Sequence, residues 1–494
     1  MYRPTIGLEI HAELKTRTKM FCDSLNDPDE KHPNVNICPI CVGHPGTLPV
    51  INKEAVKHVL KVGVALGAKL ADDSRFDRKN YFYPDLPKGY QISQYQYPLV
   101  KTGMLVLPSS GKKIRITRVH LEEDAARNVH NPKTGHTLVD FNRAGVPLME
   151  LVTEPDMKSA AEAREFAEEL QLILRYIGAS DADMEKGQMR VEANISIAPA
   201  ALLGGETAKL GTKVEVKNIN SFRAVERAIL YEIKRQAEVI EAGGKVILET
   251  RGWDDQKGET YSQRSKEEAH DYKYFPEPDL PPLKRSAVAE FGREALLGEL
   301  PELPNAKRAR FESEYGMSGA SREFFVRDAA LASFFEQAAS EAERWAPQVE
   351  KQKLISLLVN YITSDLAGLL SARGLSVADI RITPENFAEL VKMAATGEIS
   401  SRGAKDLIAE MLETGGDPSD LAEKGGHKIR QDSGALEEII KKVIAENAKA
   451  AEDYKKGKET SLKFLVGQAM REAKARKMGV NPQQLEELLK KLLF

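Results

Sequence analysis

Three titratable residues at alternate positions near the start of the chain form the first candidate site. Glu9, His11 and Glu13 lie within Gly7–Glu13, a segment with the pattern of a β-strand. Side chains two residues apart on a strand project to the same face. Two carboxylates beside an imidazole can hold a divalent cation, and oxygen ligands favour Mg²⁺ or Mn²⁺. The alternative is an exposed strand face that binds nothing.

Two more acidic positions lie where active-site carboxylates are often found. The run Glu122-Glu123-Asp124 directly follows a predicted strand. Three consecutive carboxylates repel one another unless water or a cation neutralises them, so the run is either a solvated loop or part of a site. Glu150 stands among apolar residues, and a carboxylate in such surroundings needs a partner or a bound ligand.

The segment Arg78–Gln94 combines four aromatic rings with three cations. A solvated loop does not need this many rings, and a core strand does not accommodate this many charges. The mixture suits a surface that holds a flat polar group and an anion. Lys79 and Lys88 are the candidate phosphate contacts, and Tyr81 and Tyr83 the candidate stacking residues. Packing of these rings in a core is the alternative.

A cysteine pair suggests a different metal. Cys38 and Cys41 form a CxxC pair, and Cys22 lies sixteen residues upstream. Such a set is typical of zinc, but a closed structural zinc site uses four ligands, and Ser24 occupies the position where a fourth cysteine would be expected. The alternative is a tight turn with buried free thiols. Residues able to replace the missing ligand are Asp23, His32 and His44.

A strand that runs into a helix gives the last candidate. In Glu215–Arg223, amide and hydroxyl side chains precede the predicted helix start. Exposed N–H groups there, together with Lys217 and Arg223, suit a phosphate. An ordinary N-cap at Ser221 is the alternative.

The whole chain restricts these interpretations. It has 494 residues, which predicts two to four domains, and its net charge of −3 announces no general affinity for nucleic acid. Neither a signal peptide nor an apolar run long enough to span a membrane is apparent. Three cysteines argue against a disulfide framework and for a reducing, cytoplasmic location. No Walker A loop, GxGxxG or HExxH motif is present.

The elements that must position these residues change character along the chain. Ile114–Val119 and Arg190–Ile195 alternate apolar and polar residues, as strands of a mainly antiparallel sheet do. A helix is expected to begin at Ser159, and a second one follows Ser221. From about residue 293, helical periodicity dominates. The sequence therefore predicts an α+β protein with three domains: a cradle over 1–292, an all-α domain over 293–412 and a small α-helical tail over 413–494.

Taken together, the motifs resemble one family, the B subunit of aspartyl/glutamyl-tRNA amidotransferase (GatB). The tail, Phe464–Met470 in particular, resembles the YqeY-like domain of that family. The resemblance covers essentially the whole chain. The matching stretches of the first domain are Ile6–His11, Cys38–Pro49, Arg78–Gln94, Arg118–Asp124, Asp140–Glu150, Glu215–Phe222, Glu249–Arg251 and Asp271–Asp279.

The resemblance implies a reaction and its cofactors. Members of the family use ATP and Mg²⁺ to phosphorylate the side-chain carboxylate of Glu-tRNA(Gln) or Asp-tRNA(Asn), and ammonia derived from glutamine then gives the amide. The resemblance also implies two partners, a GatA-like amidase and a small GatC-like protein, and no membrane. The family's metal and catalytic positions match Glu9, His11, Glu123 and Glu150. Residues assigned to ATP or the tRNA end are Lys79, Lys88, Tyr81, Tyr83, Lys217 and Arg223.

The sequence leaves two questions open. A non-catalytic module that only delivers tRNA would account for the tail over 451–494, where ten Lys/Arg face six Asp/Glu, a net charge of +4. That alternative does not account for His11 beside converging acids. The departure from the family pattern at Ser24 leaves zinc at Cys22, Cys38 and Cys41 undecided. Which misacylated tRNA is the substrate does not follow from the sequence.

Overall fold

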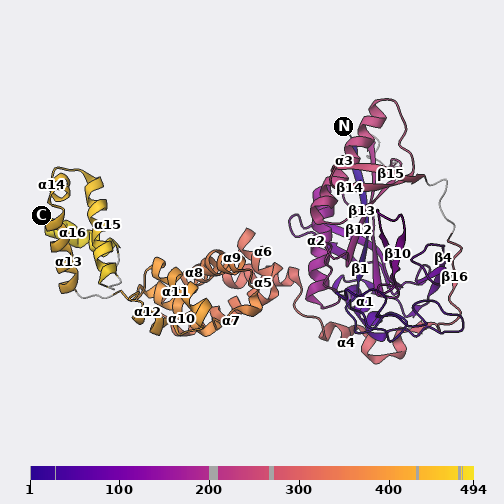
Figure 1. Cartoon of the computed structure of the whole chain (residues 1–494), viewed down its shortest axis with the longest axis horizontal. Helices are drawn as coiled ribbons and strands as arrows, with labels where there is room; N and C mark the ends of the chain where they lie inside the picture. Colours follow the sequence, from indigo (N-terminus) through magenta and orange to yellow (C-terminus); the bar gives the residue numbers. More distant parts are fainter. Residues whose placement is uncertain are drawn as a thin grey trace. The chain divides into compact units, whose positions relative to one another are not determined.

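The computed structural model describes residues 2–27, 29–199, 210–265, 272–429, 433–476, 480 and 482–493. Asp271 of the motif Asp271–Asp279 lies outside these residues, as do 477–479, 481 and 494 of the basic tail. Two compact units divide the chain, Met1–Asn305 and Ala306–Phe494. Strands of the first unit and helices of the second confirm the predicted α+β class (Figure 1).

The elements of the first unit alternate between strands and a few helices. Its strands are β1 (Tyr2–Glu13), β2 (Lys69–Leu70), β3 (Asp73–Ser74), β4 (Asp77–Asn80), β5 (Tyr90–Ser93), β6 (Val100–Lys101), β7 (Met104–Val106), β8 (Lys113–Glu123), β9 (Arg127–His130), β10 (Thr137–Asp140), β11 (Pro147–Thr153), β12 (Met189–Pro199), β13 (Val214–Ile219), β14 (Glu249–Asp254), β15 (Glu259–Ser265), β16 (Phe275–Pro276) and β17 (Leu283–Lys284). Its helices are α1 (Lys53–Ala65), α2 (Ala160–Tyr176), α3 (Phe222–Glu241), η3 (Arg285–Ala287), η4 (Ala289–Phe291) and α4 (Arg293–Gly298), followed by the start of α5 (Pro304–Tyr315).

One long sheet organises this unit. Its strands follow the order β15-β14-β13-β12-β1-β11-β8-β6-β2, with β7 paired to β8. The pairs β1–β11, β1–β12 and β8–β11 are antiparallel, and β13–β14 is parallel. The predicted strands Ile114–Val119 and Arg190–Ile195 lie within β8 and β12, so the expected mainly antiparallel sheet is confirmed.

The two faces of the sheet differ sharply because side chains alternate along each strand. On β1, Ile6, Leu8, Ile10 and Ala12 are buried in a hydrophobic core that also contains side chains of α1, α2 and α3. The alternate residues of β1 therefore point away from the helices. The helices α2 and α3 lie along one side of the sheet (Figure 1).

Local signals fix the helices that carry this core. The Ser159 hydroxyl accepts the backbone N–H of Glu162 at 3.2 Å, as expected for an N-cap. The Glu162 carboxylate accepts the N–H of Lys158 instead of that of Ser159, so the two residues differ from a capping box by one position. Ser221 caps α3 in the same way through the N–H of Ala224 at 3.0 Å.

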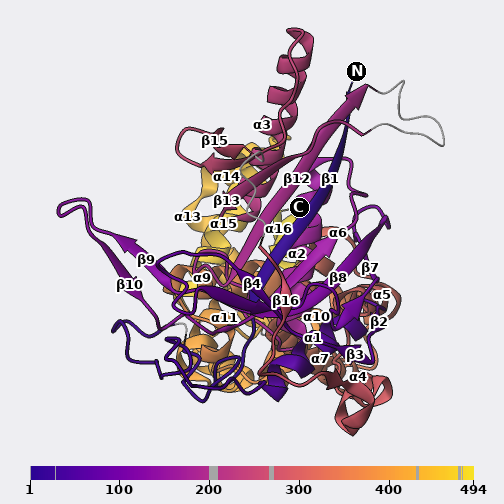
Figure 2. The ribbon, with the colours of Figure 1, turned by 90° about the vertical axis from the view of Figure 1, so that its right-hand side faces the viewer.

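A small sheet lies beside the end of β8. Its strand order is β16-β4-β5. The Gln91 side chain of β5 donates to the backbone carbonyl of Glu123 at 2.7 Å, which ties the two sheets together. A separate hairpin, β9–β10, extends from the unit (Figure 2).

The second unit contains two hydrophobic cores. Residues between Phe311 and Ala422 form one, and residues between Leu436 and Leu493 form the other. Its elements after α5 are α6 (Gly319–Arg327), α7 (Ala329–Trp345), α8 (Lys351–Asn360), a π-helix (Tyr361–Leu366), α9 (Ala367–Arg373), η6 (Val377–Asp379), α10 (Pro384–Thr396), α11 (Ser401–Thr414), α12 (Pro418–Lys424), α13 (Ser433–Glu446), α14 (Ala448–Lys455), α15 (Glu459–Ala475) and α16 (Pro482–Leu493).

The predicted domain boundaries after residues 292 and 412 stay predictions. Leu296, Leu300 and Leu303 belong to the core of the first unit, which extends that unit to Asn305. Ala422 of α12 packs in the same core as α10 and α11. The first core thus includes Leu303, beyond residue 292, and the next core includes Ala422, beyond residue 412.

One helical stretch among the described residues has the length and apolar character of a membrane span. It covers Lys351–Arg373, with a mean hydropathy of 1.4. Its apolar residues at Leu354, Leu358, Ile362 and Leu366 belong to the core of the second unit. A buried core helix passes the same test, so this stretch is weak evidence for a membrane.

Candidate active site

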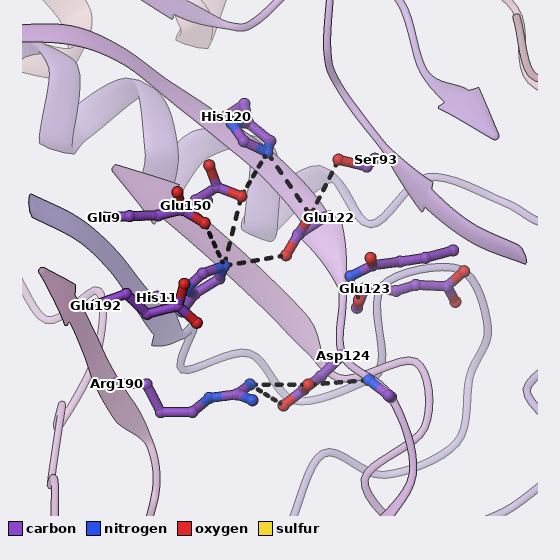
Figure 3. Close-up of polar contacts among 12 residues, drawn as sticks. Glu9, His11, Ser93, His120, Glu122, Glu123, Asp124, Glu150, Arg190 and Glu192 are labelled. Carbon is purple, nitrogen blue, oxygen red and sulfur yellow. Dashed lines mark hydrogen bonds and ion pairs between the residues drawn. The ribbon is translucent and has the colours of Figure 1, made fainter. Parts of the chain in front are cut away.

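Strand register brings charged residues from three neighbouring strands into one row. On β1, His11 lies opposite Glu150 of β11, and Glu150 lies opposite His120 of β8. Because Glu9 and Glu122 stand two residues from His11 and His120 on their strands, they share the same face. The five side chains converge on the face of the sheet away from the helices (Figure 3).

The donor atoms approach one another without forming close hydrogen bonds. His11 Nε2 lies 3.4 Å from Glu150 Oε2, 3.8 Å from Glu122 Oε1 and 3.9 Å from Glu9 Oε1. His120 Nε2 lies 3.4 Å from Glu150 Oε2 and 3.6 Å from Glu122 Oε2. His120, Glu122 and Glu150 are buried. We call these five residues the acid–imidazole cluster.

This donor set fits a divalent metal ion. Ligand atoms bound to one Mg²⁺ or Ca²⁺ at 2.0–2.6 Å stand about 3 to 3.7 Å apart, close to the spacing in the cluster. The sets Glu9–His11–Glu150 and His120–Glu122–Glu150 each bring one donor atom per residue within 4.8 Å of the others. The three carboxylates suit Mg²⁺ or Mn²⁺, whereas the two imidazoles are ligands more typical of transition metals. In addition, the buried Nδ1 of His120 has no partner among the described residues.

The pKa values of Glu9 and His11 are also shifted by the neighbouring carboxylates. Burial, and then the charges of Glu150 and Glu192, raise the pKa of Glu9 to about 7. Burial opposes protonation of His11, but the hydrogen bond and charge of Glu150 and the charge of Glu122 outweigh it and raise the pKa of His11 to about 9. Burial acts against ionisation of Glu150, but the charge of His120 and the hydrogen bond and charge of His11 outweigh it and lower the pKa of Glu150 well below its usual range.

A lysine neutralises the acids next to the cluster. Glu192 of β12 lies opposite Glu9, and Lys217 of β13 lies 2.5 Å from Glu192 and 3.7 Å from Glu215. Burial disfavours the Lys217 ammonium, yet the charges of Glu192 and Glu215 raise its pKa. Lys217, a predicted site residue, thus lies beside the cluster and is already paired with carboxylates.

Two arginines lie on the other side of the cluster. Arg190, opposite His11 on β12, lies 2.9 Å from Asp124 Oδ1, and Arg143 lies 2.6 Å from Asp124 and 2.7 Å from Glu13. Burial of the Asp124 carboxyl acts against ionisation, but the two guanidinium groups lower its pKa well below the usual range. Glu13, the third residue of the β1 pattern, therefore binds Arg143 and lies outside the cluster.

The structure does not place Glu123, a predicted metal ligand, in the cluster. Its carboxylate pairs with the Lys88 ammonium and accepts the backbone N–H of Ile92 at 2.9 Å. Glu122 and Glu123 are consecutive on β8, so they point to opposite faces. The assignment of Glu123 as a metal ligand beside Glu9, His11 and Glu150 stays a prediction. In the structure, Glu122 is the acid of this pair that faces His11 and His120. Lys88 likewise has a carboxylate partner.

His120 and Glu122 are not among the predicted site residues, although the sequence contains a signal that places both on this face. The alternation in Ile114–Val119 puts Ile114, Ile116 and the buried Val119 and Leu121 in the core. Continuing the alternation to the end of the strand assigns His120 and Glu122 to the other face. The predicted strand ends at Val119, whereas β8 continues to Glu123, so the alternation extends through the run of acids.

Lys79 stands at the edge of the cluster. No carboxylate lies within ion-pair distance of its ammonium in the part of the chain that the structure describes. It lies 5.0 Å from the Tyr272 ring centroid and 5.8 Å from that of Tyr81. Burial disfavours its charge, but Glu122 and other nearby groups raise its pKa, so it stays an ammonium.

The other predicted binding residues are more remote. Tyr81 packs edge-on against Tyr83 at 6.5 Å, and burial raises its pKa. Tyr83 is exposed, and Arg223 is exposed at the start of α3. The structure thus brings Glu9, His11, Glu150, Lys79 and Lys217 together and leaves Tyr83 and Arg223 outside the cluster.

The three cysteines also converge. Their sulfur atoms lie within 4.8 Å of one another, and Cys41 Sγ accepts the Cys38 N–H at 3.0 Å. The Ser24 hydroxyl is 3.9 Å from Cys41 Sγ. The Lys19 ammonium is fully buried, and the Cys41 sulfur hydrogen-bonds with it. This set supplies three of the four ligands of a closed zinc site, so zinc there stays a prediction.

Comparisons with known proteins identify the family of this chain. A family model described as the GatB/GatE catalytic domain matches residues 4–289, and one described as the GatB domain matches residues 346–493. The chain is 45% identical over 494 residues to the B subunit of the aspartyl/glutamyl-tRNA(Asn/Gln) amidotransferase of Thermoanaerobacter pseudethanolicus, covering 100% of this chain and 99% of the relative. It is 45% identical over 498 residues to the protein of the same name from Thermotoga maritima, again covering 100% and 99%. The chain therefore belongs to the GatB family of tRNA amidotransferase subunits.

Proposed function

We propose that this chain is the B subunit of a tRNA-dependent amidotransferase that activates the side-chain carboxylate of a misacylated tRNA with ATP. The convergence of Glu9, His11, His120, Glu122 and Glu150 on one sheet face carries the proposal. Membership of the GatB family supplies the substrates: Glu-tRNA(Gln), Asp-tRNA(Asn) or both, with ATP.

The reaction sets a charge problem that this site is suited to solve. The γ-phosphoryl group of ATP passes to a carboxylate oxygen, ADP leaves, and ammonia then attacks the acyl carbon so that phosphate leaves with the carbonyl reformed. Two anions must approach each other first. When bound, Mg²⁺ supplies electrostatic neutralisation of the phosphate oxygens and the carboxylate. The acid–imidazole cluster would hold it.

The protein's own side chains complete the site. Lys79 lacks an ion-pair partner in the described part of the chain and lies next to Glu122, so its ammonium is available to a phosphate. Arg190 and Arg143 restrain Asp124 beside the cluster. The paired lysines, Lys88 and Lys217, keep Glu123 and Glu192 neutralised rather than contact phosphate directly.

The family membership also supports the proposed partners. The relatives are named as one subunit of an amidotransferase, which implies a multi-subunit enzyme. We infer a GatA-like amidase as the source of ammonia and a small GatC-like protein, with the assembly acting in the cytoplasm. Binding of zinc by Cys22, Cys38 and Cys41 is not required by this chemistry.

The test is a reconstitution. The chain is assembled with the GatA-like and GatC-like partners, and ATP hydrolysis and amide formation are measured with each misacylated tRNA and without tRNA. ADP formation that depends on a divalent cation and rises with one misacylated tRNA supports the proposal. Full tRNA binding without stimulated ADP formation would favour a module that only delivers tRNA.

A further inference from the structure

A continuous row of tyrosine rings runs along the small sheet beside Lys79. Tyr81 meets Tyr272 at 5.8 Å, Tyr272 meets Tyr274 at 6.1 Å, and Tyr274 stacks on Tyr95 at 4.6 Å with the rings 12° from parallel. Tyr83 continues the row beyond Tyr81 at 6.5 Å. The rings come from segments that flank β4, β5 and β16. We call this series the tyrosine row.

The row belongs to the rim of the active site. Strand alternation puts Lys79 and Arg78 on opposite faces of β4, and Arg78 pairs with Glu277 at 2.7 Å and lies over Tyr90. Tyr81 directly follows β4, and its ring centroid lies 5.8 Å from the Lys79 ammonium. Burial, together with the charges of Glu122 and Glu150, raises the pKa of Tyr274 to about 12, so its phenol is neutral at pH 7. The same two carboxylates act on Lys79.

The ends of the row are open. Tyr95 is 53% exposed and Tyr83 is 61% exposed. Large aromatic surfaces are normally covered, and a ring that already stacks in parallel on a neighbour offers its other face to a further flat group. Base–tyrosine stacking of this type is tolerant of base edges and needs no hydrogen-bond code.

We propose that the tyrosine row binds the adenine ring of an adenosine that enters the active site. The inference rests on the proposed function, in which two reactants must meet at Lys79 and the acid–imidazole cluster. Both carry an adenosine: ATP, and the terminal nucleotide of the aminoacylated tRNA. In the tRNA, the ribose of this adenosine bears the reacting amino acid, and in ATP the ribose bears the triphosphate. Each adenine is therefore joined through its ribose to a group that reacts at the cluster.

The experiment uses the assembled enzyme with Tyr95→Leu and Tyr274→Leu, each paired with a phenylalanine variant that keeps the ring. Tyr261→Leu is the matched control because Tyr261 is an exposed tyrosine on β15, away from the row. KM for ATP and KM for misacylated tRNA are measured separately, with kcat. Removal of a stacked base contact predicts a rise of about tenfold in one KM, little change in kcat, and recovery by phenylalanine.

The outcomes identify the source of the adenosine. A rise only in KM for ATP assigns the row to the nucleotide, and a rise only in KM for tRNA assigns it to the terminal adenosine. Leucine variants indistinguishable from Tyr261→Leu, or phenylalanine variants as impaired as leucine variants, would overturn the inference. Equilibrium binding of ADP and of uncharged tRNA gives a second readout if a variant turns over too slowly. Absence of tRNA-stimulated ADP formation in the unsubstituted enzyme would instead count against the proposed function.

Discussion

The acid–imidazole cluster and the cysteine cluster look alike as sequence patterns and differ as sites. In the first, nitrogen and oxygen atoms stand 3.4 to 3.9 Å apart on rigid neighbouring strands, too far for good hydrogen bonds. In the second, Cys41 Sγ already accepts a backbone N–H at 3.0 Å and lies beside the buried Lys19 ammonium. Three carboxylates and two imidazoles that face one another at these distances indicate a cation site better than residue type does.

The largest effect should follow loss of the carboxylate shared by both halves of the first cluster. Glu150 contacts His11 and His120, and also Arg118 at 3.3 Å. We expect Glu150→Gln to reduce ATP-dependent amide formation by roughly a hundredfold or more, because charge stabilisation by a bound metal is worth several kcal/mol. Affinity for tRNA, measured by filter binding, should change less than about twofold. If the Glu150→Gln variant formed amide at nearly the rate of the unsubstituted enzyme, the cluster would have no role in the reaction.

The adjacent acids of β8 give the sharpest contrast. Glu122 faces the two histidines, whereas Glu123 faces Lys88. We expect Glu122→Gln to weaken Mn²⁺ binding by about 10- to 100-fold, and Glu123→Gln to change it only about twofold. The readout is a Mn²⁺ titration followed by electron paramagnetic resonance, with thermal unfolding of both variants as the control. The reverse order of effects would restore the assignment made from the sequence.

This pair also shows how far the sequence could go. Alternation along β1 correctly predicted that Glu9 and His11 share a face, and the α+β class followed from the change in periodicity. The pairing of Glu150 with both His11 and His120 depends on the register of strands that are far apart in sequence, which local patterns do not contain. The choice between Glu122 and Glu123 depends on the alternation of side chains along β8, where a shift of one residue exchanges the two faces. Tyr95 and Tyr274 stack on each other although they lie far apart in the sequence and belong to no common motif.

A smaller difference is expected between Lys79, which lacks a carboxylate partner among the described residues, and Lys217, which is paired with Glu192 and Glu215. Lys79→Met should raise KM for ATP by about tenfold, a change of about 1.4 kcal/mol, with little effect on stability. Lys217→Met leaves Glu192 and Glu215 without their cation, so it should lower the free energy of unfolding by about 1 to 3 kcal/mol. Steady-state kinetics and urea unfolding measure the two effects. Equal stability losses would mean that Lys79 is a structural residue.

The smallest effect should come from the cysteine cluster. Removal of zinc with a chelator, followed by restoration of Mg²⁺, should change the rate of amide formation less than about twofold, since no step needs that metal. Ser24→Cys would complete a set of four thiols and should raise the zinc content of the purified chain, measured by mass spectrometry. A rate that collapses on chelation and returns only with zinc would contradict this view of the cluster.

Location of the bound metal tests the central claim most directly. Crystals of the assembled enzyme grown with Mn²⁺ and a non-hydrolysable ATP analogue would show the ion by its anomalous scattering. The account predicts a peak bounded by the Glu150 and Glu122 carboxylates and by imidazole nitrogens of His11 and His120, with Lys79 beside the terminal phosphate. A peak at Glu123, or an active complex whose metal lies away from these four residues, would contradict it.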